Sequence, residues 1–103
     1  MADVEFKSGA GELVSGYLAD TDRLAGNVVV IHEWWGLNDQ VRSVCDRFAQ
    51  ANFRAFAPDL YDGYVATNAE DAGKKMGALD WGRAISKVRA GCDQLCKRGA
   101  GIG

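Results

Sequence analysis

A run of four β-branched residues is the feature that most limits how this chain can fold. Residues 28–31 contain no polar side chain, and such a run is typical of a strand that is covered on both faces of a parallel sheet. The turn-forming residues 36–39 follow, and Asn38 or Asp39 can cap a helix there. The sequence therefore predicts a buried strand, a turn and a helix in direct succession.

Apolar side chains then recur every three or four residues, as they do along one face of a helix. This face consists of Val41, Val44, Cys45, Phe48 and Ala49, and the helix is expected to end near Asn52. Residues 53–57 are short and apolar and are closed by Pro58, which predicts a second buried strand. Strand, helix and strand form a βαβ unit, which is right-handed in nearly all proteins.

The two ends of the chain add a hairpin and further helices to this unit. Residues 4–7 and 13–19 alternate partially around a turn at residues 8–11, which predicts an antiparallel hairpin. A short helix is expected from Asn68 or Glu70 to Met76, and a long helix follows it. The apolar face of the long helix consists of Trp81, Ile85, Val88, Cys92 and Leu95. Three glycines in residues 99–103 end it, at the expected start of another strand.

Composition indicates one folded domain over residues 1–103, of the α/β class, with a mostly parallel sheet flanked by helices. Hydrophobic residues make up 48% and charged residues 25% of the 103 positions, which is usual for a globular protein. The net charge is −2, and twelve basic residues are spread among fourteen acidic ones, so no nucleic-acid partner is expected. No apolar segment approaches the roughly 20 residues of a membrane span, and no signal peptide is recognised, so a cytoplasmic location is expected.

The cysteines and the glycine-rich tail predict neither a metal site nor a cofactor site. Cys45, Cys92 and Cys96 are an odd number, which favours reduced thiols. His32 is the only histidine, and no Cys-x-x-Cys or His-x-x-x-His spacing occurs, so no metal is expected. The glycines of residues 99–103 follow a helix, whereas a dinucleotide fingerprint follows a strand.

Residues 28–40, Val-Val-Val-Ile-His-Glu-Trp-Trp-Gly-Leu-Asn-Asp-Gln, place charged and aromatic side chains where α/β proteins bind ligands, at the carboxyl end of a strand. This segment resembles the dienelactone hydrolase (carboxymethylenebutenolidase) family, whose third strand ends in a similar glutamate-containing turn. Residues 57–63 resemble the exit of that family's next strand, and the opening hairpin and residues 76–81 also match. The resemblance reaches about Lys97. It implies the N-terminal half of an α/β-hydrolase fold and a carboxylic-ester or lactone hydrolase with a Cys-His-Asp triad.

The nucleophile of that family lies in a Gly-x-Cys-x-Gly turn, which these 103 residues do not contain. We expect structural roles for the three cysteines, with Cys45 and Cys92 facing the core and Cys96 partly exposed. The triad histidine and aspartate come later in the family, so His32 is expected to pack and Asp59 inherits no catalytic role. Asp59 and Asp62 are expected to bond to their own backbone. The chain alone is therefore predicted to be inactive.

Two residues match functional positions of the family. Glu33 matches a glutamate that lies beside the nucleophilic cysteine and helps to control its ionisation. Trp34 matches the position whose backbone amide helps to form the oxyanion hole. The alternatives are that Glu33 meets water or caps a turn, and that the side chains of Trp34 and Trp35 only cover the end of the sheet.

The resemblance also bears on substrate. The family member that hydrolyses dienelactone holds the substrate carboxylate with an arginine and a tyrosine from the segment matching residues 69–76. Neither residue type occurs in that segment here, so a general ester or lactone substrate is expected.

The family's sheet continues from the strand at residues 28–31 to the nucleophile strand, so this strand is expected to form an open edge. Open edges recruit other strands, and we expect a homodimer or higher oligomer through the edge, or a complex with a C-terminal half. Three functions remain open: a hydrolase fragment without turnover, a non-catalytic self-associating interaction module, and one subunit of a split hydrolase.

Overall fold

The computed structural model describes residues 2–9 and 11–97, with the backbone alone of Cys96 and Lys97. Within them the elements are β1 (Ala2–Lys7), β2 (Leu13–Ala19), β3 (Gly26–Val29), α1 (Asp39–Gln50), β4 (Phe53–Pro58), α2 (Ala69–Gly77) and α3 (Trp81–Lys97). The strands form one sheet in the order β1-β2-β4-β3. The β1–β2 and β2–β4 pairs are antiparallel and the β3–β4 pair is parallel. The predicted α/β class, hairpin and βαβ unit are thus confirmed, whereas the strand expected at residues 99–103 lies outside the described residues.

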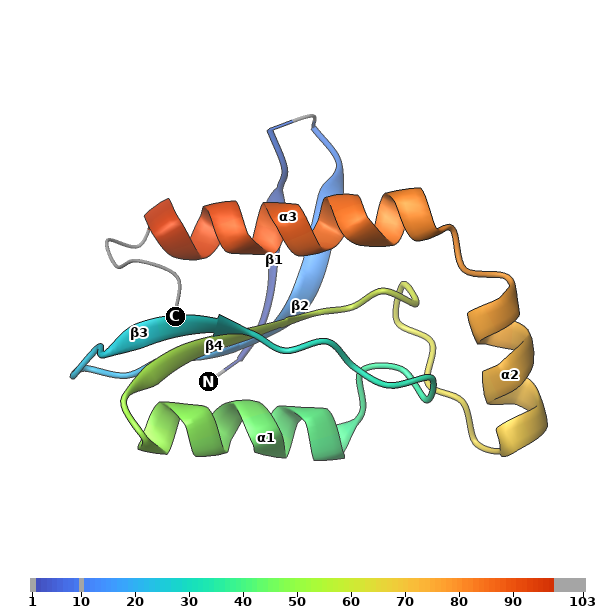
Figure 1. Cartoon of the computed structure of the whole chain (residues 1–103), viewed down its shortest axis with the longest axis horizontal. Helices are drawn as coiled ribbons and strands as arrows, with labels where there is room; N and C mark the ends of the chain where they lie inside the picture. Colours follow the sequence, from blue (N-terminus) through green and yellow to red (C-terminus); the bar gives the residue numbers. More distant parts are fainter. Residues whose placement is uncertain (1, 10, 98–103) are drawn as a thin grey trace.

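The sheet lies between two helices, with α1 on one face and α3 on the other, while α2 lies beyond the end of the sheet (Figure 1). The core under α1 includes Cys45 and Ala49 of the predicted helix face. The core under α3 is built around Val14 and Phe56. Asn38 caps α1, since its side-chain oxygen accepts the Val41 N–H at 3.1 Å. The local pattern therefore predicted α1 and its cap correctly.

Residues 28–31, the β-branched run, were expected to form a strand covered on both faces, but the structure covers them less. β3 ends at Val29, although the Val30 N–H still donates to the Phe56 carbonyl oxygen at 2.9 Å. Residues 28–30 are only half-buried, and Ile31 is 52% exposed. The reason is that β3 is an edge strand of the described sheet, so no strand beside it extends the ladder or the core.

The apolar face predicted for α3 is rotated relative to the face that the sheet buries. Trp81 and Ile85 are each 57% exposed, and Cys92 is half-buried rather than fully in the core. The sheet and the loop after β4 instead bury the side of the helix that carries Ala84, Lys87, Ala90, Gly91 and Leu95. α3 is 17 residues long, and no helix among the described residues is long and apolar enough to cross a bilayer.

The Phe56 ring of β4 packs closely against two glycines, one in the hairpin and one in α3. A Cβ added at Gly91 of α3 would lie 2.9 Å from the Phe56 ring, and one added at Gly16 of β2 would lie 2.7 Å from it. Contacts this short force a neighbour to move, and Phe56 is only 3% exposed. Both glycines therefore allow the close packing of α3 and β2 around one aromatic ring.

We predict that Gly91→Ala destabilises the protein, by about 1–3 kcal/mol, because overpacking against Phe56 outweighs the helix propensity gained. Gly73→Ala on α2 is the matched control, since its Cβ would make an ordinary contact of 3.8 Å with Trp34. This control is expected to raise the unfolding free energy by about 0.5–1 kcal/mol. Urea unfolding followed by circular dichroism measures both changes. Equal stabilisation by the two alanines would contradict the packing described here.

Candidate active site at the end of β3

His32 joins the end of β3 to the loop that leaves β4. Its Nε2 accepts the Leu60 N–H at 3.0 Å, and its Nδ1 lies 2.8 Å from the Glu33 carbonyl oxygen. A neutral ring with the proton on Nδ1 satisfies both bonds. His32 is 7% exposed, and its ring meets the Tyr61 ring edge-on with the ring centroids 4.9 Å apart. His32 therefore packs, as expected, and holds the backbone of the next residue in place.

A tight turn follows His32 and fixes the direction of the next residues. The Gly36 N–H donates to the Glu33 carbonyl oxygen at 3.1 Å, and the Trp35 carbonyl oxygen accepts the Ala66 N–H at 2.9 Å. Gly36 has φ +99°, and a Cβ there would lie 2.5 Å from the Tyr64 carbonyl oxygen. Only glycine fits this position without strain, so the turn is held firmly against residues 64–66.

Glu33 is exposed at the outer edge of the sheet. Within the described part of the chain, its carboxylate forms no hydrogen bond or ion pair. It lines a pocket of about 220 Å³ that lies between the end of β3 and α1. The other residues of this pocket are mostly apolar: Val30, Ile31, Trp35, Gly36, Asn38, Gln40, Val41 and Val44. Among the described residues no strand lies beside this edge of β3, and the Glu33 side chain is exposed.

Trp34 adds a backbone donor beside this carboxylate. Its N–H has no acceptor among residues 2–9 and 11–97. Its indole ring packs edge-on against Trp35 with the ring centroids 5.5 Å apart, and its side chain lies 37% exposed near Gly73 of α2. Glu33 and Trp34 thus follow one another in the turn after β3, and the two tryptophan rings pack against each other.

The described cysteines are placed for packing. Cys45 is fully buried in α1, and burial together with Asp46 raises the pKa of its thiol from 9.0 to about 11. A thiol with this pKa stays protonated near neutral pH and is a poor nucleophile. Cys92 is free and half-buried in the middle of α3, and the Cys96 side chain lies outside the described atoms. Neither described thiol stands on a strand-to-helix turn.

We predict that alkaline pH destabilises the protein partly through Cys45. Because the pKa in the folded state is raised to about 11, the stabilisation is complete below the unfolded pKa near 9 and is lost as the pH rises toward 11. Urea unfolding from about pH 8 to pH 11 should show a falling unfolding free energy. The fall should be smaller in Cys45→Ala, and an identical pH dependence in this variant would contradict the assignment. Tyr17 adds a further loss of stability at higher pH, because its hydrogen bond to Asp46 raises its pKa to about 12.

Two aspartates on the loop after β4 have different roles. Asp59 accepts the N–H groups of Tyr61 and Gly63 at 3.0 and 2.8 Å, so its expected bonding to the local backbone is confirmed. The same expectation for Asp62 is wrong. Its carboxylate instead accepts hydrogen bonds from Lys87 at 2.6 Å and Arg83 at 3.0 Å, because α3 places both cations above the loop.

The Asp62 network was not predicted from the sequence. The Lys87 side chain is only 3% exposed, and its ammonium group also donates to the Asp59 carbonyl oxygen at 3.3 Å. Arg83 extends the network to Glu12 of the hairpin at 3.0 Å. The bond from Lys87 is the main cause that lowers the Asp62 pKa. The sequence offered one clue, because Lys87 follows Ala84 by three residues and precedes Gly91 by four. It therefore lies on the same side of α3 as these two small residues.

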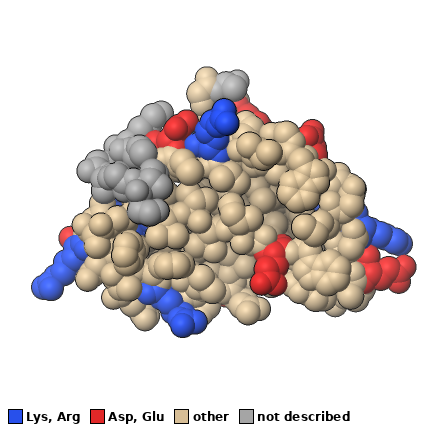
Figure 2. Space-filling model, viewed as in Figure 1, with Lys and Arg blue, Asp and Glu red and all other residues tan. Residues whose placement is uncertain are grey.

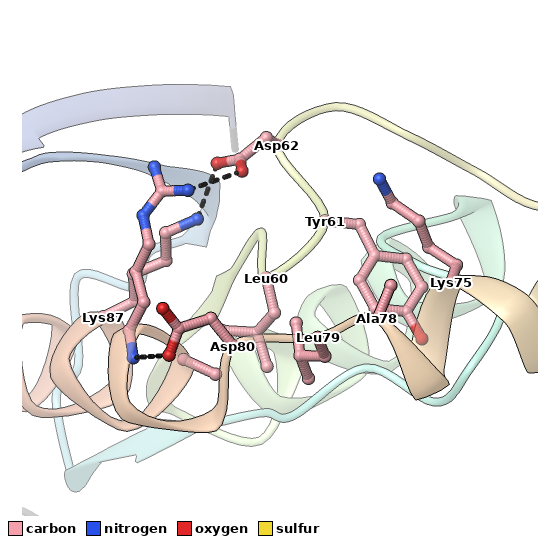
Figure 3. A pocket seen from close by; sticks show the side chains of 10 residues that line it. Leu60, Tyr61, Asp62, Lys75, Ala78, Leu79, Asp80 and Lys87 are labelled. Atoms are coloured by element: carbon pink, nitrogen blue, oxygen red, sulfur yellow. Dashed lines mark hydrogen bonds and ion pairs between the residues drawn. The ribbon is translucent and has the colours of Figure 1, made fainter.

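A cavity of about 150 Å³ adjoins this network between α2, α3 and the loop after β4. Figure 3 shows Asp62 turned toward the two cations at one end of the cavity, with Tyr61 and Lys75 at the other end. Since Lys87 and Arg83 are already paired with carboxylates, the network joins α3 to the loop and the hairpin, and we assign it a structural role.

We predict that Asp62→Ala lowers the unfolding free energy by about 2–4 kcal/mol, because it leaves the buried Lys87 ammonium without its carboxylate. Glu70→Ala is the matched control. Glu70 pairs with Lys74 across an exposed turn of α2 at 3.5 Å, and loss of an exposed pair costs at most about 0.5 kcal/mol. Chemical denaturation measures both values. Equal effects of the two substitutions would show that the Asp62 network contributes nothing beyond a surface pair.

Comparison with solved structures identifies the fold. A structure described as a dienelactone hydrolase from Klebsiella pneumoniae superposes with a TM-score of 0.74 at 21% identity, over 97% of this chain and 46% of that one. The protein m3DLH gives 0.69 at 30% identity, over 92% and 42% of the two chains. A dienelactone hydrolase-like promiscuous phosphotriesterase from metagenomic libraries gives 0.68 at 25%, over 99% and 44%. The chain thus has the fold of part of these proteins and spans less than half of their length.

Sequence comparison gives the family. The model of the dienelactone hydrolase family matches residues 14–98, so the chain belongs to that family. A curated relative, Protein usf of Aquifex pyrophilus, is 50% identical over 50 residues, which are 46% of this chain and 21% of the relative. The family resemblance seen in residues 28–40 and 57–63 is therefore confirmed.

Proposed function

We propose that this chain supplies one half of the active site of an ester or lactone hydrolase, with Glu33 and the Trp34 amide as its contribution. The observation that carries the proposal is the position of both groups. An exposed carboxylate and a backbone N–H that has no acceptor among residues 2–9 and 11–97 follow one another at the carboxyl end of β3, which is an edge strand of the described sheet. Ligands of open α/β sheets bind at these carboxyl ends.

Each group has a distinct chemical role in this proposal. The Trp34 N–H stabilises the negative charge that develops on the ester carbonyl oxygen when a nucleophile attacks it. The Glu33 carboxylate sets the ionisation of a nearby thiol, since a negative charge within a few ångströms disfavours a second one. Membership of the dienelactone hydrolase family, whose model matches residues 14–98, supports both roles, because the segment around Glu33 and Trp34 resembles the glutamate-containing turn of that family.

The nucleophile in this proposal comes from outside these 103 residues, so the chain alone does not turn over ester. Cys45 is buried with a raised pKa, and both ring nitrogens of His32 are engaged in bonds to the backbone. Free thiols at Cys45 and Cys92 support a cytoplasmic location as part of the proposal.

A general ester or lactone is the proposed substrate class. Residues 69–76 contain two lysines and no arginine or tyrosine. The two lysines are occupied in the structure, since Lys74 pairs with Glu70 and Lys75 lies over the Tyr64 ring at 4.9 Å. The segment therefore lacks both residue types on which specificity for dienelactone is expected to depend.

The test is hydrolysis of p-nitrophenyl acetate by the purified chain, alone and mixed with a separately produced C-terminal half of a dienelactone hydrolase that carries the Gly-x-Cys-x-Gly turn. We expect no turnover above buffer for the chain alone, and measurable turnover for the mixture. In the mixture, Glu33→Gln should lower kcat at least about tenfold and shift its pH profile. Glu70→Gln, an exposed glutamate of α2, should leave kcat unchanged.

Two results would contradict the proposal. Turnover by the chain alone that survives replacement of Cys45, Cys92 and Cys96 would show another catalytic group. An active mixture that is indifferent to Glu33→Gln would show that this carboxylate has no role in the reaction.

A further inference from the structure

The peptide group between Glu33 and Trp34 is held at its carbonyl end. The Glu33 carbonyl oxygen accepts the Gly36 N–H at 3.1 Å and lies 2.8 Å from Nδ1 of His32. This peptide is trans, so its C=O and N–H bonds point in opposite directions. The two bonds at the oxygen therefore also set the direction in which the Trp34 N–H points.

The imidazole that makes one of these bonds is itself held by the loop after β4. Its Nε2 accepts the N–H of Leu60, a residue that is only 8% exposed, at 3.0 Å. A neutral imidazole has one donor and one acceptor, and these two bonds use both of them. The His32 ring therefore connects the Leu60 amide to the Glu33 carbonyl, and it has no nitrogen left for acid–base chemistry.

Tyr61 holds both this ring and the turn beside it. Tyr61 is 3% exposed, and its ring meets the imidazole edge-on with the ring centroids 4.9 Å apart. Its Cδ2 would lie 3.2 Å from a Cβ added at Gly36, so the same ring packs against the turn. The Tyr61 N–H donates to the Asp59 carboxylate at 3.0 Å. Both donors to the Glu33 oxygen thus lie against one buried side chain of the loop after β4.

These contacts prepare the Trp34 N–H as a hydrogen-bond donor. Hydrogen bonds that a carbonyl accepts polarise the peptide and strengthen its N–H group. A donor whose direction is fixed in advance costs no reorganisation when negative charge develops beside it. In Figure 2, as in Figure 1, β3 lies toward the reader, and most Lys and Arg side chains lie toward the outline of the molecule. Backbone donors rather than cations are therefore what the middle of this face offers to an anion.

We propose that His32 is a positioning residue, which orients the candidate oxyanion donor through the peptide between Glu33 and Trp34. With its proton on Nδ1, the ring donates to the Glu33 carbonyl oxygen and accepts the Leu60 N–H, and so aims the Trp34 N–H. His32 touches no reacting atom in this arrangement. The tautomer of the ring and the direction of the peptide are properties of this chain alone, whereas their effect on turnover rests on the proposed function.

Two replacements of His32 separate positioning from packing. His32→Phe keeps an aromatic ring against Tyr61 but removes both hydrogen bonds. His32→Gln restores one donor and one acceptor, which a single carbon separates in the carboxamide as in the imidazole. Gly91→Ala is the control for stability, because it is also expected to lower the unfolding free energy but acts through Phe56.

The first measurement is nuclear magnetic resonance of the purified chain alone. At neutral pH the His32 ring should carry its proton on Nδ1, and a scalar coupling across the hydrogen bond should connect Nε2 to the Leu60 amide. The residual dipolar coupling of the Trp34 N–H should fit its direction in the structure. His32→Phe should change this dipolar coupling, while His32→Gln and Gly91→Ala should preserve it.

The second measurement repeats the ester assay in the mixture with a C-terminal half of a dienelactone hydrolase. His32→Phe should lower kcat at least about tenfold with little change in KM, because a donor that acts only in the transition state affects kcat and kcat/KM equally. His32→Gln should recover most of this loss. Gly91→Ala should leave kcat unchanged at a temperature where the chain is folded.

Three results would overturn the proposal: a proton on Nε2 in the wild type, a Trp34 dipolar coupling that His32→Phe leaves unchanged, or a kcat that falls equally in His32→Phe and Gly91→Ala. The first of these needs no variant, so it decides the question even if His32→Phe fails to fold. A wild-type mixture without turnover contradicts the proposed function instead, and the measurements on the chain alone still decide what orients the Trp34 N–H.

Discussion

The pairing of β3 with β4 on one side only is the constraint on which the rest of this structure depends. The parallel ladder to β4 holds β3 in the sheet, and His32 ties its end to the loop after β4 through Leu60. These bonds fix Glu33 and Trp34 in space. The outer side of β3 has no strand among the described residues, so the same segment that positions the candidate site also leaves it open.

Local sequence patterns were sufficient to predict the βαβ unit. A β-branched run, the cap at Asn38 and the apolar face around Cys45 are short-range features, and each appears in the structure near its predicted position. Glu33 and Trp34 were singled out by the resemblance of residues 28–40 and 57–63 to the dienelactone hydrolase family, and their roles remain a prediction.

The errors arose where a residue depends on a partner far along the chain. Asp62 was expected to bond locally, but Lys87 and Arg83, more than twenty residues away, take its carboxylate. Trp81 and Ile85 follow the period of a buried helix face, yet they remain exposed. Periodicity shows that a helix has an apolar side, but it does not show how much of that side the sheet can cover.

Amide hydrogen exchange at β3 tests the central claim most directly. The Val30 amide, bonded to Phe56, should be protected. The Val29 amide, which the alternation of the strand directs away from β4, should exchange freely. Protection of the Val29 amide in the purified chain would show that this side of β3 is covered and would contradict the account.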